Sequence, residues 1–161
     1  MTRFTHVYSE SVYLPAADDK VFAFIDDHRS FSAHMGQSSV MMAGSKMKTT
    51  VDGKNGQAVG SHIQMEGNML GFHLYLDEVI TQREPPRLKI WQTVGNPQLI
   101  IIADYQMSVR ILPRDSGSQL TVTIDYNLPE KNAWLGKLLG GWYAKWCVRQ
   151  MIQGTSDTFH S

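Results

Sequence analysis

The sequence predicts an α+β fold in which a curved antiparallel sheet of about seven strands wraps around one long C-terminal helix. Two observations carry this prediction. Within residues 130–160, apolar side chains recur at helical spacing from Leu135 to Trp146, whereas most of the chain before them reads as β-strands separated by short turns. A helical stripe this long and this rich in aromatic residues must pack against a broad apolar surface, which the sheet would supply. We therefore expect a single domain over residues 1–161.

The composition is typical of a globular protein and argues against several classes of protein. Apolar residues make up 42% and charged residues 19% of the 161 residues, enough for a sizeable core. Fifteen basic residues balance fifteen acidic ones, so we expect no nucleic-acid partner. The single cysteine, Cys147, excludes an internal disulfide and is consistent with a reducing, cytoplasmic location. No apolar run reaches the roughly 18 residues of a transmembrane segment.

The chain begins with a strand followed by a helix. Residues 5–14 are rich in β-forming side chains, and Pro15 stops that strand. Asp18 and Asp19 suit the positive end of a helix, which should finish near Asp27.

A second short helical turn is predicted over residues 29–35, closed by Gly36. Six strands follow, and the short turns between them favour an antiparallel meander. The predicted strands span residues 39–51, 57–67, 69–82, 87–94, 98–112 and 119–128. Gly95-Asn96-Pro97 is expected to form one of the turns.

Two strands alternate clearly enough to assign their faces. In residues 69–82, Leu74 and Leu76 should face one side of the sheet, and His73 and Asp77 the other. In the last strand the predicted inner residues are Leu120, Val122, Ile124, Tyr126 and Leu128.

The terminal helix carries an apolar stripe when it is laid out at about 100° per residue. The stripe comprises Leu135, Leu138, Leu139, Trp142 and Trp146. We expect it to face the sheet, with Lys137, Ala144 and Val148 on the far side. Arg149 continues the stripe, so either the helix emerges into solvent there or it lines a cavity with a polar recess.

This order of elements resembles the START-like, or helix-grip, superfamily (SRPBCC), which includes polyketide cyclases/dehydrases and lipid-transfer domains. The resemblance covers nearly the whole chain. It rests on the segments 14–16 with 21–25, 78–79 with 85–88, and 134–143. It implies a cavity between the sheet and the terminal helix that holds an apolar small molecule, and it does not specify a reaction.

We therefore expect binding of a hydrophobic small molecule of lipid, polyketide or isoprenoid type, with no cofactor. The expected lining residues are Phe31, Met35, Trp91, Tyr105, Met107, Leu138, Trp142, Trp146 and Arg149. One alternative is a cyclase or dehydratase of polyketide type. Another is an accessory protein that docks a partner or a membrane, similar to the subunit-G-like relatives associated with carbon monoxide dehydrogenase. A homodimer is left open.

The sequence does not identify a catalytic residue. The candidates for acid–base chemistry all lie in strands: Glu66, Asp77, Asp104 and Tyr105. A carboxylate on the inner face would be desolvated, with a pKa near neutrality that suits enolisation or aldol cyclisation. A carboxylate on the solvated face of the sheet would not take part in this acid–base chemistry. His62 and His73 lie on strands that could pair, but no third ligand fits, so we expect no metal site.

Overall fold

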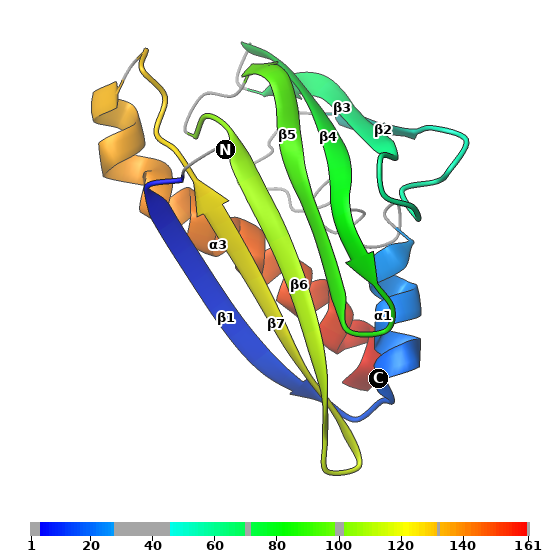
Figure 1. Cartoon of the computed structure of the whole chain (residues 1–161). Coiled ribbons are helices and arrows are strands. Elements are labelled where there is room, and N and C mark those ends of the chain that lie inside the picture. Colours follow the sequence, from blue (N-terminus) through cyan, green and yellow to red (C-terminus); the bar gives the residue numbers. More distant parts are fainter. Residues whose placement is uncertain (1–3, 28–45, 70–71, 99–101, 132, 161) are drawn as a thin grey trace.

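The computed structural model describes residues 4–27, 46–69, 72–98, 102–131 and 133–160 (Figure 1). The elements are β1 (His6–Leu14), α1 (Asp18–Asp26), β2 (Lys46–Val51), β3 (His62–Met69), β4 (Phe72–Glu84), β5 (Leu88–Gln98), β6 (Tyr105–Arg114), β7 (Gly117–Tyr126) and α3 (Ala133–His160). The predicted helical turn at 29–35 lies outside the described residues. No helix in the described ranges is both long and apolar enough to cross a lipid bilayer.

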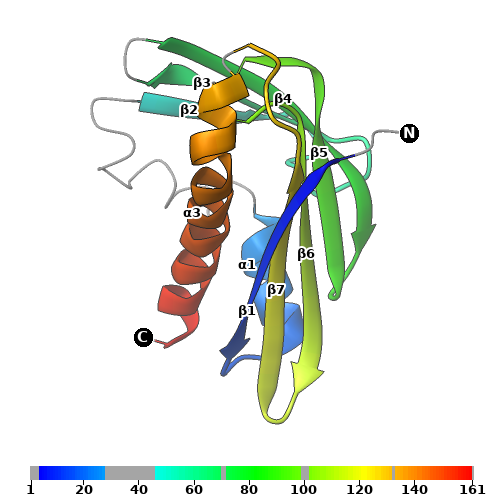
Figure 2. The same ribbon diagram turned by 90° about the vertical axis from the view of Figure 1, so that its left-hand side faces the viewer.

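The strands form one seven-stranded antiparallel sheet in the order β1-β7-β6-β5-β4-β3-β2. Strands β2 to β7 follow one another as a meander, and β1 closes the order beside β7. Figure 2 shows the sheet as a curved layer, with α3 and α1 on the same side of it. This arrangement confirms the predicted fold class. Successive strands pair antiparallel because the turns that join them are short.

The core lies between the inner face of the sheet and the two helices. The alternation predicted for β7 is confirmed, since Leu120, Val122, Ile124 and Tyr126 are all buried, and Leu128 beyond the strand packs partly buried against them. In β4, Leu74 and Leu76 are also buried as predicted, and His73 is exposed. Period-two hydrophobicity therefore located the inner face correctly.

An ion cluster fixes the end of α1 to the sheet. The Asp26 carboxylate accepts hydrogen bonds from Arg83 Nε and Nη2, at 3.1 and 2.7 Å, and lies 3.0 Å from the ammonium group of the fully buried Lys89. Burial raises the pKa of Asp26, but the Arg83 hydrogen bonds and the Lys89 charge outweigh it and lower that pKa overall. The guanidinium of Arg83 also lies over the Phe22 ring, 5.5 Å from its centroid.

The predicted turn at Gly95-Asn96-Pro97 is wrong, because β5 runs through it to Gln98. The register against β4 shifts here, from Val94 opposite Asp77 to Gln98 opposite Tyr75. This shift is an irregularity within the strand and not a chain reversal. Gly95 supports it with a φ of 69°, which glycine adopts without steric cost.

The orientation predicted for the terminal helix is also wrong. The buried residues of α3 are mostly small: Gly136, Gly140, Ala144, Cys147, Val148, Met151, Gly154 and Thr155. Ala144 and Val148, expected on the far side, are fully buried, whereas Leu138 and Trp142 are 71% and 51% exposed. Small side chains let the helix approach the sheet closely, and this packing overrode the hydrophobicity of the opposite face.

Candidate functional site

A carboxyl group lies inside the apolar core on β4. Glu78 follows Leu76 and precedes Ile80 on the inner side of the strand, and its residue exposure is 1%. A carboxyl group so placed loses most of its hydration, which disfavours its charged form. Glu78 is therefore the polar group in the core that calls for a chemical explanation.

The hydroxyl group of Tyr105 meets this carboxyl group from β6. Tyr105 Oη donates a hydrogen bond to Glu78 Oε2 over 2.5 Å. Thr93 of β5 holds the Tyr105 backbone, because its Oγ1 accepts from the Tyr105 amide at 3.1 Å and donates to the Tyr105 carbonyl at 3.4 Å. The backbone pairing of β5 with β6 ends at Gln92 and Gln106. Beyond that pair, where the two strands separate, the hydrogen bonds of the Thr93 side chain hold Tyr105 in place of backbone pairing.

Trp91 on β5 is the third polar side chain beside Glu78. It is 1% exposed and stands opposite Ile80 of β4 and Met107 of β6. Its indole hydrogen-bonds to the Glu78 carboxyl group, and the ring N–H is the only donor that an indole offers. Three neighbouring strands thus place an acid, a phenol and an indole together.

Burial dominates the protonation of Glu78. It raises the pKa of Glu78 from 4.5 to about 7, with a smaller increase from the neighbouring charge of Asp77. The hydrogen bonds from Tyr105 and Trp91 and the charge of Lys89 act in the opposite direction without cancelling the effect of burial. Near neutral pH, Glu78 can therefore exist as donor or as acceptor.

The helix side of this site supplies a thiol and a second phenol. Cys147 is 5% exposed, and burial raises the pKa of its thiol to about 12. Burial likewise raises the pKa of Tyr143 well above its usual value. A protonated thiol is a poor nucleophile, so Cys147 serves here as a small apolar group that packs beneath the sheet.

The expected lining residues divide into three groups. Trp91, Tyr105 and Met107 lie on the inner face of the sheet, and their contact with a ligand stays a prediction. The inward orientation expected for Leu138 and Trp142 is wrong, because both are exposed. Trp146 is partly buried and stacks on Tyr143, with ring centroids 5.9 Å apart, and Arg149 is exposed. Phe31 and Met35 lie outside the described residues.

Arg149 does not form a buried polar recess. Its side chain is 57% exposed, and Nε lies 3.1 Å from Oε1 of Glu10 on β1. Of the two interpretations left open by the sequence, the solvated one is correct. The reason is the orientation of α3, which exposes Leu138 and Trp142 of the stripe together with Arg149.

The strand carboxylates suggested by the sequence lie elsewhere, and Glu78 was missed. Glu66 and Asp77 each face a histidine, with His73 Nε2 at 3.5 Å and His62 Nδ1 at 3.0 Å respectively. His62 and His73 thus meet carboxylates and not each other. Glu78 was detectable, because the alternation that placed Leu74 and Leu76 inside also places it there. Within the described ranges no group of three His, Cys, Asp or Glu residues could hold a metal ion.

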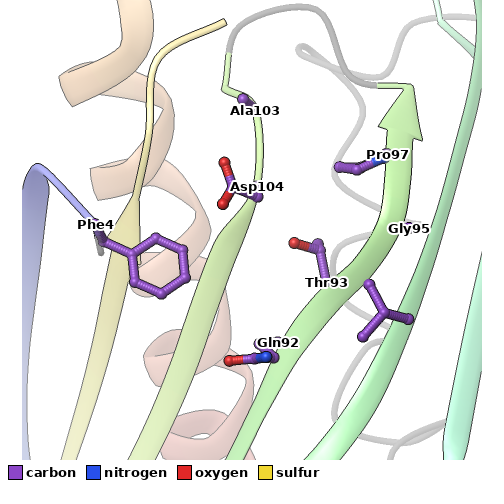
Figure 3. Close-up of a pocket in the computed structure, with 8 residues that line it drawn as sticks. Phe4, Gln92, Thr93, Gly95, Pro97, Ala103 and Asp104 are labelled. Carbon is purple, nitrogen blue, oxygen red and sulfur yellow. The ribbon is translucent and has the colours of Figure 1, made fainter. Parts of the chain in front are cut away.

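A second candidate is a surface pocket of about 520 Å³ where β5 and the start of β6 separate (Figure 3). Its lining residues are Phe4, Gln92, Thr93, Val94, Gly95, Pro97, Ala103 and Asp104. Both carboxylate oxygens of Asp104 accept from the Asn127 side-chain amide at 3.1 Å. Asp104 therefore anchors the segment after β7, and the interior pair of Glu78 and Tyr105 remains the stronger candidate site.

The comparisons with known proteins agree with this architecture. No protein-family model matches the chain, and no curated protein sequence matches it. Among solved structures, truncated norcoclaurine synthase from Thalictrum flavum is similar, with a TM-score of 0.67, 14% identity, and coverage of 98% of this chain and 96% of the other. A protein of Thermus thermophilus has a TM-score of 0.66 at 13% identity, covering 94% and 95% of the two chains.

The structure of Ara h 8.0201 is similar over 96% of this chain and 97% of its own, with a TM-score of 0.65 and 13% identity. Identities this low carry information about the fold and not about ligands or reactions. The similarities cover nearly all of this chain, and so include its sheet and its two described helices. These likenesses show that the chain has the fold of these structures, the helix-grip fold that the sequence predicted.

Proposed function

We propose that this protein binds an apolar small molecule carrying one carbonyl or hydroxyl group, in the interior between the sheet and α3. The pair formed by Glu78 and Tyr105 carries the proposal, because it places a protonatable carboxyl group and a phenol among apolar side chains. Lipids, polyketides and isoprenoids all combine a large apolar surface with such a group. The fold supports the proposal by placing the sheet and helix around a common interior.

Keeping an acid buried at position 78 costs free energy of desolvation. An apolar residue of similar volume at position 78 would avoid the desolvation that raises its pKa to about 7. A carboxyl group kept half-protonated near neutrality can donate to a carbonyl oxygen or accept from a hydroxyl group. That versatility suits recognition of one oxygen on an otherwise apolar ligand.

Binding of a fluorescent naphthyl ketone tests the proposal. We expect saturable binding that quenches tryptophan emission, with the parent naphthalene binding more weakly because it lacks the oxygen. Glu78→Gln and Tyr105→Phe should each reduce the preference for the ketone by about fivefold to tenfold, the equivalent of one hydrogen bond. Asp104→Asn, in the surface pocket, is the matched control and should leave binding unchanged.

Two results would count against the interior site. Loss of binding in Asp104→Asn with retention in Glu78→Gln would move the ligand to the surface pocket. A folded wild-type protein without saturable binding of either probe would remove the proposal itself.

The second candidate function is catalysis of the cyclase or dehydratase type. The observation that favours it is the pKa of about 7 for Glu78, since a general acid or base works best near the operating pH. Turnover of a polyketone surrogate, abolished in Glu78→Gln while its binding is retained, would support an enzyme. Binding without turnover would favour a carrier.

A further inference from the structure

The N-terminal half of α3 presents large apolar side chains to solvent. Trp134, Leu138 and Trp142, here called the Trp134 face, recur every fourth residue and so lie along one side of the helix. They are 67%, 71% and 51% exposed. Figures 1 and 2 show these first turns of α3, in orange, at the periphery of the fold. A contiguous apolar stripe of this kind is typical of an interaction surface.

Within this half of α3, every charged side chain is basic. Lys131, Lys137 and Lys145 lie just before or within this half of the helix, and the sequence contains no acidic residue between Glu130 and Asp157. Lys131 and Lys137 are exposed, and Lys145 is partly exposed. The protein as a whole has no net charge, so this basic sector is a local feature and not a consequence of composition.

This charge pattern discriminates between occupants. A second copy bound through the same face in a two-fold dimer would bring like-charged lysines together. An anionic lipid surface complements them, and tryptophan side chains partition favourably into the interfacial region of a bilayer. Lysine stems also reach from an apolar face toward lipid head groups.

We propose that the Trp134 face and its three lysines bind the surface of an anionic lipid bilayer, with α3 lying in the interfacial plane. The buried side of the helix, from Gly136 to Thr155, stays packed on the sheet. Docking therefore requires no unfolding of the core. The Trp134 face is exposed whereas Glu78 is buried in the core, so this surface shares no residue with the proposed ligand site.

Flotation with phosphatidylcholine vesicles, with and without phosphatidylglycerol, tests the proposal. We expect wild type to float with the anionic vesicles, weakly with the neutral ones, and less at high salt. Replacing Trp134, Leu138 and Trp142 together by glutamine should lower the bound fraction about tenfold or more without changing the thermal midpoint. Acyl-chain-brominated lipid should quench wild-type tryptophan emission.

Matched variants separate this surface from general stickiness and from the interior site. Val7→Gln with Leu112→Gln, at positions 65% and 50% exposed on strands, should float like wild type. Glu78→Gln should also float, whatever becomes of its ligand binding. The proposal is overturned if wild type does not float, if neutral and anionic vesicles bind equally, or if the triple variant still floats. It is also overturned if the triple variant instead converts a dimer into a monomer.

Discussion

Replacing Glu78 by glutamine should remove one identifiable part of the pH dependence of stability. Glutamine keeps the shape of the side chain and an oxygen that can accept the Tyr105 hydrogen bond, but it does not titrate. The wild-type carboxyl group has a pKa near 4.5 when unfolded and about 7 when folded. Folding therefore favours its protonated form.

The sign and size of the effect follow from this difference. Below pH 4.5 Glu78 is protonated in both states, and its contribution to stability is fully present. Between pH 4.5 and about 7 the unfolded chain releases the proton while the folded protein retains it, so stability falls as pH rises. Above about 7 the loss is complete and amounts to about 3 kcal/mol.

Urea unfolding of wild type and Glu78→Gln from about pH 4 to about pH 9 measures this loss. The difference between the two proteins is the quantity of interest, because the six histidines and the surface carboxylates contribute equally to both. Relative to the variant, wild type should lose about 3 kcal/mol across the range. A constant difference, or a wild type that gains stability as pH rises, would refute the buried, uncharged Glu78.

Three further perturbations test the packing. Val148→Ala, at a fully buried position, should lower the free energy of unfolding by about 2 kcal/mol, whereas Leu138→Ala should change it by less than about 0.5 kcal/mol; urea denaturation showing equal losses would contradict the orientation of α3. Asp26→Asn leaves the buried Lys89 ammonium group without its carboxylate, so chemical denaturation should show a loss of about 3–5 kcal/mol, and a neutral result would contradict the ion cluster. Arg149→Met breaks an exposed ion pair and should leave the thermal midpoint unchanged. A large drop in that midpoint would contradict the solvated position of Arg149.

Strand alternation and turn spacing were sufficient to predict the antiparallel sheet, although the turn expected at residues 95–97 was wrong. The alternation in β7 assigned Leu120 through Tyr126 to the core correctly, because a side-chain period of two admits only two faces. The same rule applied two residues further along β4 would have found Glu78. The expectation that carboxylates face solvent hid it, although buried acids are common at functional sites.

The orientation of α3 could not be predicted from hydrophobicity, because the helix offers two competing faces. One carries Trp134, Leu138 and Trp142, and the other carries Gly140 and Ala144. Burying the larger side chains gains more transfer free energy, but the smaller ones permit a closer approach of backbone to sheet. The separation of β5 from β6 at Thr93 is likewise a tertiary feature that local sequence does not encode.

Direct titration of the Glu78 carboxyl carbon by ¹³C NMR, with the resonance assigned by its disappearance in Glu78→Gln, tests the central claim. The free protein should show a midpoint of about 7. Saturation with the naphthyl ketone should raise that midpoint, because the protonated carboxyl group donates to the ligand oxygen. A midpoint near 4.5, or one that the bound ketone leaves unmoved, would contradict the account of Glu78 as the polar contact of an interior ligand site.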